Sequence, residues 1–155
     1  MEAQEQALLD QVAILDVLHR YIRCVDTNGR EDEFVDLFTP DATFQVRGNY
    51  PTVDRLVHGR EGLKEFVLWL RDGKPKESYD KHVVLNPIID VRGDEAIVES
   101  NWIMMTQSSD GLTVTATGRM RDRFVKQECR WRINQRINDV EVLNMGPNPV
   151  EMNSD

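Results

Sequence analysis

Four long segments rich in β-branched residues fill the second half of the chain, and only short polar turns separate them. The segments cover residues 82–91, 96–107, 112–125 and 130–143, and the turns read RGDE, SSDG and KQEC. Turns this short join neighbouring antiparallel strands. The pattern therefore predicts an antiparallel meander, broad enough to need a second layer against one of its faces.

The first half of the chain has a helical period instead. Residues spaced by three and four predict a long helix that ends near residue 26, before Asn28 and Gly29. Shorter helices are expected over 31–38 and 59–73, with a strand at 42–46 and a polar loop over 47–60. The apolar side of the first helix is expected to contain these residues: Leu8, Val12, Leu15, His19, Ile22 and Asp26.

Helices followed by a curved antiparallel sheet indicate an α+β fold with a concave space between the two layers. We expect one domain over residues 1–143, because no repeat, low-complexity tract or linker divides it. Residues 144–155 are expected to form a C-terminal tail that is loose or packs on a partner subunit.

Charge and composition exclude several functional classes. The net charge of −8 opposes binding to nucleic acid or to an anionic membrane surface. No apolar run approaches the ~20 residues of a membrane span, and the acidic N-terminus lacks a secretory signal pattern. Cys24 and Cys129 are expected to be free thiols in a reducing cytoplasm.

Basic residues gather late in the chain, on alternating strand positions. This spacing is typical of a solvated sheet face. The residues in question are Arg119, Arg121, Arg123, Lys126, Arg130, Arg132 and Arg136.

Asp26 lies on the apolar side of the first helix, where a lone carboxylate is costly. A buried carboxylate is neutral or has a partner. The alternative is that Asp26 belongs to the turn DTNGRE and is exposed at the helix end.

His82 opens the first long strand, where Asn86 shares its face by strict alternation. If that face looks toward the helix, the imidazole meets Asp26. A histidine with a carboxylate partner has a fixed tautomer and is a competent general base. The alternative is a solvent-exposed histidine at the strand start. The three histidines lie far apart in sequence, so no metal site is expected.

The ordered segments 13–44, 58–67, 81–100 and 118–137 resemble the SnoaL-like branch of the nuclear transport factor 2-like superfamily. Its members include scytalone dehydratase, bile acid 7α-dehydratase and lindane dehydrochlorinase. The resemblance covers about residues 5–140. It implies a cone of three N-terminal helices on a strongly curved sheet, an apolar pocket inside, and a homodimer or homotrimer.

The resemblance also implies roles for individual residues. Asp26 and His82 match the Asp–His pair of the dehydratase and dehydrochlorinase members, and Tyr21 matches the dehydratase tyrosine that polarises a substrate oxygen. We therefore expect a cofactor-independent lyase or isomerase that performs dehydration, β-elimination or a double-bond shift on a hydrophobic cyclic molecule. The residues expected to bind that molecule are Asn86, Trp102, Met104, Met120 and Trp69.

A second function class fits the same fold. A non-catalytic module would use the pocket to bind a small molecule, or the sheet to assemble, without turnover. The two classes differ in the role of His82, which turnover requires and simple binding does not.

Overall fold

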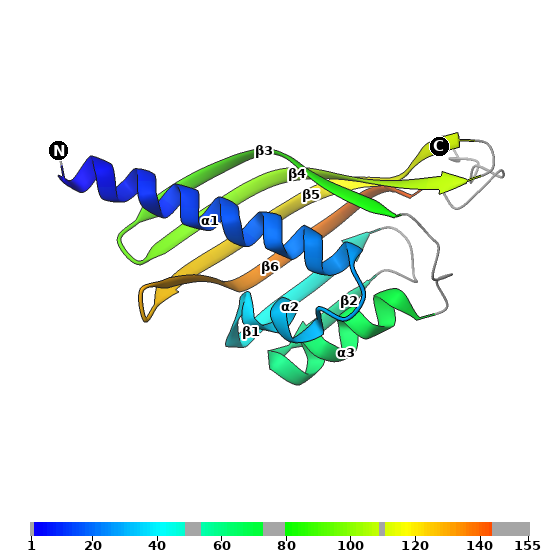
Figure 1. Ribbon diagram of the computed structural model, residues 1–155, viewed down its shortest axis with the longest axis horizontal. Helices are drawn as coiled ribbons and strands as arrows, with labels where there is room; N and C mark the ends of the chain where they lie inside the picture. Colours follow the sequence, from blue (N-terminus) through cyan, green and yellow to red (C-terminus); the bar gives the residue numbers. More distant parts are fainter. Residues whose placement is uncertain (1, 49–53, 73–79, 109–110, 144–155) are drawn as a thin grey trace, which may run out of the picture.

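The structure is a computed structural model, and it describes residues 2–48, 54–72, 80–108 and 111–143. Three helices and six strands follow one another along the chain (Figure 1). The helices are α1 (Glu2–Asp26), α2 (Glu31–Asp36) and α3 (Gly59–Arg71). The strands are β1 (Phe38–Gly48), β2 (Arg55–His58), β3 (Lys81–Arg92), β4 (Glu95–Ser108), β5 (Gly111–Gln127) and β6 (Arg130–Leu143). The predicted tail over 144–155 lies outside the described residues.

The six strands form one sheet in the order β2-β1-β6-β5-β4-β3. Strands β3 to β6 form the predicted antiparallel meander. β1 runs parallel to β6, so the sheet is not antiparallel throughout. The predicted loop over 47–60 also contains β2, which pairs with β1. The α+β class is confirmed, with helices packed on a curved sheet that does not close.

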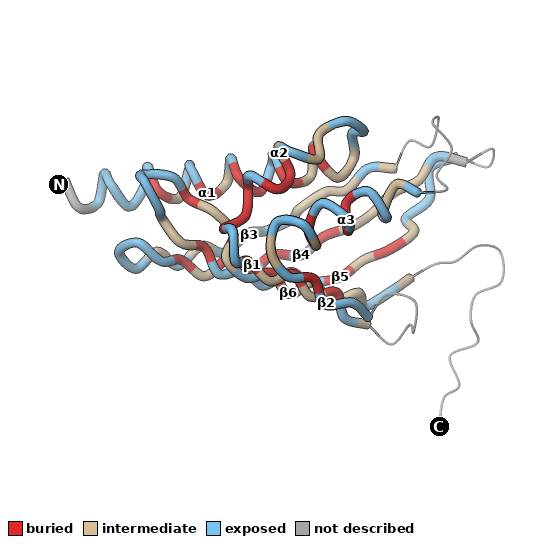
Figure 2. The backbone as a smooth tube through the Cα atoms, turned by 90° about the horizontal axis from the view of Figure 1, so that it is seen from below, coloured by how far each residue is buried: buried red, intermediate tan, exposed pale blue. Residues whose placement is uncertain are grey.

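All three helices lie on one face of the sheet, and the core fills the space between the layers (Figure 2). The buried side of α1 carries Ile14, Leu18, Tyr21 and Cys24. These residues repeat every three to four positions and form one stripe along the helix.

The predicted stripe on α1 is wrong for Leu8, Val12 and His19. Leu8 and Val12 are 62% and 57% exposed, and His19 is exposed as well. Asp10 and Ile14, on either side of Val12 in the sequence, are buried, so the sheet lies beneath this part of α1 and Val12 faces away from it. The helical period alone does not show which side of a helix turns to the sheet.

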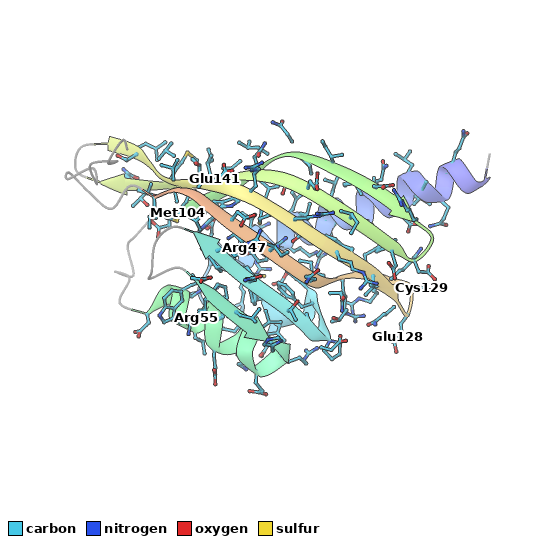
Figure 3. The ribbon with its side chains drawn as sticks, turned by 180° about the vertical axis from the view of Figure 1, so that it is seen from behind. Arg47, Arg55, Met104, Glu128, Cys129 and Glu141 are labelled. Atoms are coloured by element: carbon cyan, nitrogen blue, oxygen red, sulfur yellow. The ribbon has the colours of Figure 1, made fainter. Side chains whose placement is uncertain are left out.

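The opposite face of the sheet is polar and exposed (Figure 3). Arg47 pairs with Asp139, and Arg119 pairs with Glu141, each across neighbouring strands. Exposed pairs of this kind contribute little to stability. The prediction of a solvated basic face is wrong for Arg136, which is fully buried on the inner face.

Asp10 ties the first half of α1 to the turn between β5 and β6. Its Oδ1 accepts hydrogen bonds from Lys126 Nζ and from Trp131 Nε1, both at 2.8 Å. Burial opposes the charged form of Asp10. The hydrogen bonds from Lys126 and Trp131 outweigh burial and lower the pKa of Asp10 below its ordinary 3.8.

Replacement of Asp10 by asparagine is expected to cost about 1–3 kcal/mol of stability at pH 7, because a charged hydrogen bond to Lys126 is lost. Since the folded-state pKa lies below 3.8, this contribution is present above that pH and is lost as the pH falls through the folded-state value. Urea unfolding at pH 7 and at low pH measures both effects. The native and variant curves should approach each other in acid.

Asp16→Asn is the matched control, because Asp16 pairs with Arg20 on the exposed side of the same helix. It should change stability by less than about 0.5 kcal/mol. An equal loss in both variants would contradict the anchoring role of Asp10.

Candidate active site

An apolar cavity of about 170 Å³ lies between the helices and the inner face of the sheet. A cavity of this size is comparable to one that holds a single aromatic ring. Among the described residues, its walls come from α1, α3 and strands β1 to β6. The lining residues are Tyr21, Ile22, Val25, Phe44, Val46, Arg55, Phe66, Trp69, Leu70, His82, Trp102, Met104, Ala116, Met120, Asn138, Val140 and Leu143.

The carboxylate of Asp26 meets the imidazole of His82 at the edge of this cavity. His82 Nδ1 and Asp26 Oδ1 are 2.6 Å apart, and the backbone N–H of His82 donates to Asp26 Oδ2 at 3.1 Å. The side chain of Asp26 is only 7% exposed, and that of His82 is 19% exposed. Since a carboxylate accepts the hydrogen, Nδ1 carries it and Nε2 is left with a free lone pair.

Arg71 holds the end of the helix that presents Asp26. From α3, its guanidinium donates to the carbonyl oxygens of Cys24 and Thr27 and pairs with Glu31. The last carbonyls of a helix have no partner within the helix. Arg71 therefore fixes the C-terminal turn of α1, and with it the carboxylate that orients His82.

Tyr21 lines the cavity one turn before Asp26, and a buried ion pair lies beneath its ring. Arg136 Cζ is 3.8 Å from the ring centroid, and Arg136 forms a two-point bond with Asp122 at 2.7 and 2.6 Å. Burial lowers the pKa of Arg136, but Asp122 more than compensates and raises it above its ordinary value. A cation against the ring face is favourable.

The phenol of Tyr21 remains protonated throughout the neutral range. Burial raises its pKa above 10.0, and the positive charge of Arg136 offsets only part of that effect. The O–H is therefore available as a hydrogen-bond donor. No acidic residue stands among the described residues that line the cavity.

The structure places most of the expected binding residues around the same space. Trp69, Trp102, Met104 and Met120 all line the cavity with His82. Trp102 also packs near the imidazole, with ring centroids 6.3 Å apart.

The prediction for Asn86 is wrong, because Asn86 does not share the face of His82. It lines a shallow depression elsewhere, with Glu99 and Arg119. Register with β4 shifts between Leu85 and Ile88, and Asn86 has a left-handed backbone with φ of 51°. This bulge reverses the alternation, so Ile88 is exposed as well.

Sequence reasoning did not find three polar residues of the site. Arg55 stacks on Trp69 at 4.3 Å, and these two are the exposed members of the described lining. They therefore mark the opening. Asn138 lines the interior, and Arg136 lies beneath Tyr21. The period-two spacing of Arg136, Asn138 and Val140 was the available signal, but it does not tell which face is inside.

The described residues contain no group of three or more histidine, cysteine, aspartate or glutamate side chains that could hold a metal ion. Among the described helices, none is long and apolar enough to cross a membrane. Within the described residues, the site thus contains one histidine–carboxylate pair, one phenol, the side chains of Asn138 and Arg55, and a largely apolar wall.

Comparison with known protein families identifies the family of this chain. The model of the SnoaL-like domain matches residues 6–137, most of the chain. The chain belongs to the SnoaL-like family. A solved protein described as NTF2-like, from Novosphingobium aromaticivorans, has a similar fold. No curated protein matches this chain.

Solved structures show the same fold. A protein of unknown function from Mycobacterium tuberculosis is 22% identical, with a TM-score of 0.75 over 97% of this chain and 83% of its own. A protein of Novosphingobium aromaticivorans, provisionally named a scytalone dehydratase, is 19% identical, with a TM-score of 0.75 over 95% of both chains. A Catenulispora acidiphila protein in complex with S-DNPA is 24% identical, with a TM-score of 0.71 over 86% of this chain and 94% of its own.

Loss of one partner from the buried ion pair is expected to be severe. Asp122→Asn should cost about 3–5 kcal/mol, because the Arg136 guanidinium stays buried without a counter-charge. The double variant Asp122→Leu with Arg136→Met should cost less, since it removes both charges. Urea unfolding of the two variants measures the difference.

Asp139→Asn serves as the control. Asp139 lies on the same strand as Arg136, and its substitution breaks an exposed pair with Arg47. Its expected cost is below about 1 kcal/mol. If the single and double variants of the buried pair lose the same free energy of unfolding, the unpaired charge of Arg136 is not the cause of the destabilisation.

Proposed function

We propose that this protein is a cofactor-independent lyase or isomerase that acts on a hydrophobic cyclic small molecule. His82 is the general base, Asp26 holds its tautomer, and Tyr21 donates a hydrogen bond to the substrate oxygen. The observation that carries the proposal is the 2.6 Å contact between Asp26 and His82 at the wall of an apolar cavity.

The proposed reaction begins at a carbon next to a carbonyl group. Nε2 of His82 takes a proton from that carbon, and the electron pair of the C–H bond moves toward the carbonyl oxygen, which Tyr21 stabilises. In a dehydration, a C–O bond at the next carbon then breaks. The imidazolium returns its proton to the leaving oxygen, so that water and an unsaturated ketone leave an unchanged protein.

Three observations support a small apolar substrate. The cavity has a volume of about 170 Å³ and is lined largely by aliphatic and aromatic side chains. This volume favours a ligand of one or two rings over a larger polycyclic one. Among similar folds, one protein is named for scytalone dehydration and another is in complex with S-DNPA.

The proposal extends to assembly and location. Leu8, Leu9 and Val12 expose apolar surface on α1, which supports contact with a second copy in a homodimer or homotrimer. Cys24 and Cys129 are unpaired, which supports a cytoplasmic location.

The second candidate is a non-catalytic binding module of the same fold. The sparse polar lining of the cavity favours it, because an apolar pocket with few polar groups suits ligand capture as well as turnover. Binding without turnover would leave His82 as a wall residue whose loss has little consequence.

Proton exchange tests the general base without knowledge of the natural substrate. The protein should accelerate deuterium exchange at the acidic carbon between the ring and carbonyl of 2-tetralone in D₂O, as followed by NMR. His82→Ala should lower this rate by about 10²–10⁴-fold, and Tyr21→Phe by at least about tenfold. Binding of 2-tetralone to both variants should be nearly unchanged.

His58→Ala is the control, because His58 does not line the cavity. If the native protein binds 2-tetralone tightly but exchange is no faster than in buffer alone, the result would favour the binding module and reject the enzyme.

The tautomer of His82 gives a second test. At neutral pH the native protein should show a strongly deshielded Nδ1–H proton signal on one histidine, because a carboxylate accepts that hydrogen. In Asp26→Asn the signal should move upfield or disappear, while the signals of His19 and His58 stay unchanged. Nitrogen-15 labelled protein assigns each ring. A His82 spectrum that ignores the substitution would remove the orienting role of Asp26.

A further inference from the structure

Besides Trp102, whose Nε1 donor also lacks a partner, Asn138 is the residue of the described cavity lining that has a buried polar atom without a hydrogen bond. It lies on the inner face of β6, paired in register with Val46 of β1 and Met120 of β5, and all three residues line the cavity. Its Oδ1 is buried and has no hydrogen-bond partner among the described residues.

A buried acceptor without a partner is costly and is unusual in folded proteins. A ligand in the cavity could supply the missing hydrogen. We infer that Asn138 Oδ1 accepts a hydrogen bond from a hydroxyl group of the ligand, so that the substrate is a cyclic hydroxy compound.

The chemistry of the acceptor restricts the ligand. A carbonyl oxygen, an ether or a halogen has no hydrogen to donate, so none of them satisfies Oδ1. An aliphatic amine would enter apolar surroundings as an ammonium ion, and the carboxylate of Asp26 at the cavity edge is already bound to His82. A hydroxyl group donates one hydrogen bond and remains neutral, which suits apolar walls.

This inference deepens the proposed function and, as regards the reaction, rests on it. A substrate that must carry a hydroxyl group favours dehydration, in which that group can leave, over a double-bond shift. It also distinguishes this site from one built for a halogen leaving group. Recognition of the hydroxyl, however, needs no turnover and can be measured by itself.

Three ligands with one ring frame isolate the hydrogen bond. 2-Tetralol donates and accepts, 2-tetralone only accepts, and tetralin does neither. The native protein should bind 2-tetralol about tenfold more tightly than 2-tetralone, a difference of about 1.4 kcal/mol. Dissociation constants from calorimetry or NMR titration measure this preference.

Asn138→Leu keeps the size of the side chain and removes the acceptor. The preference for 2-tetralol should fall to less than about twofold, while tetralin binds at least as well as before. Asn101→Leu is the matched control on the exposed side of β4, and it should leave all three affinities unchanged. Equal affinities for 2-tetralol and 2-tetralone in the native protein would overturn the inference.

A preference for 2-tetralol that survives in Asn138→Leu would also overturn it. Asn138→Asp covers the case in which the leucine variant does not fold, because aspartate keeps an acceptor at the same place. The Asn138→Asp variant should still bind 2-tetralol more tightly than 2-tetralone. Equal affinities for the two ligands in this variant would count against the inference. 2-Tetralol and tetralin have no carbonyl group and undergo neither the proposed exchange nor the elimination, so these two affinities can be compared whether or not the proposed reaction occurs.

Discussion

Helix α1 lies across the sheet and is held to it by polar contacts at three places. These contacts fix the position of the helix over the cavity. Asp10 binds Lys126 and Trp131 near one end, and Asp26 binds His82 at the other. Between them, Tyr21 rests on Arg136. Hydrophobic contact alone is non-directional and would allow the helix to slide or rotate over the sheet. The hydrogen bonds that Asp10 and Asp26 accept fix its position, and the same geometry that holds the helix also holds the candidate general base.

The charged groups beneath and beside the cavity have partners before any ligand arrives. Asp122 neutralises Arg136, and two N–H groups of His82 donate hydrogen bonds to Asp26. Burial of such groups is tolerable only when each has a partner. These groups are thus occupied within the protein, and the selectivity of the cavity comes from its shape and from a few other polar atoms. Asn138 matters for this reason, because its Oδ1 is a buried acceptor not already bound to a described residue.

The sequence predicted most of the helices and strands, since long segments with a clear period of 3.6 or two residues indicate a helix or a strand. From the residues alone, a meeting of Asp26 with His82 was one of two alternatives, and the resemblance to the SnoaL-like branch favoured it. Prediction from the sequence failed where a local irregularity changes which way side chains point. The bulge at Asn86 reverses the alternation in β3, and nothing in the pattern of the strand announces it. Arg136 was assigned to solvent because a run of arginines on alternating positions does not reveal that one of them crosses to the inner face with Asp122.

The parallel pairing of β1 with β6 was beyond sequence reasoning for a related reason: it joins segments about ninety residues apart and depends on the whole sheet. That pairing nevertheless shapes the site. It brings Val46 beside Asn138, and β2 beyond β1 brings Arg55 to the opening. His82 stands on β3, at the far edge of the same sheet. A ligand that contacts both Asn138 and His82 lies against the inner face of β6, β5, β4 and β3, because residues of all four strands line the cavity. How close these two side chains come to each other is therefore a property of the curved sheet as a whole, and not of any one residue.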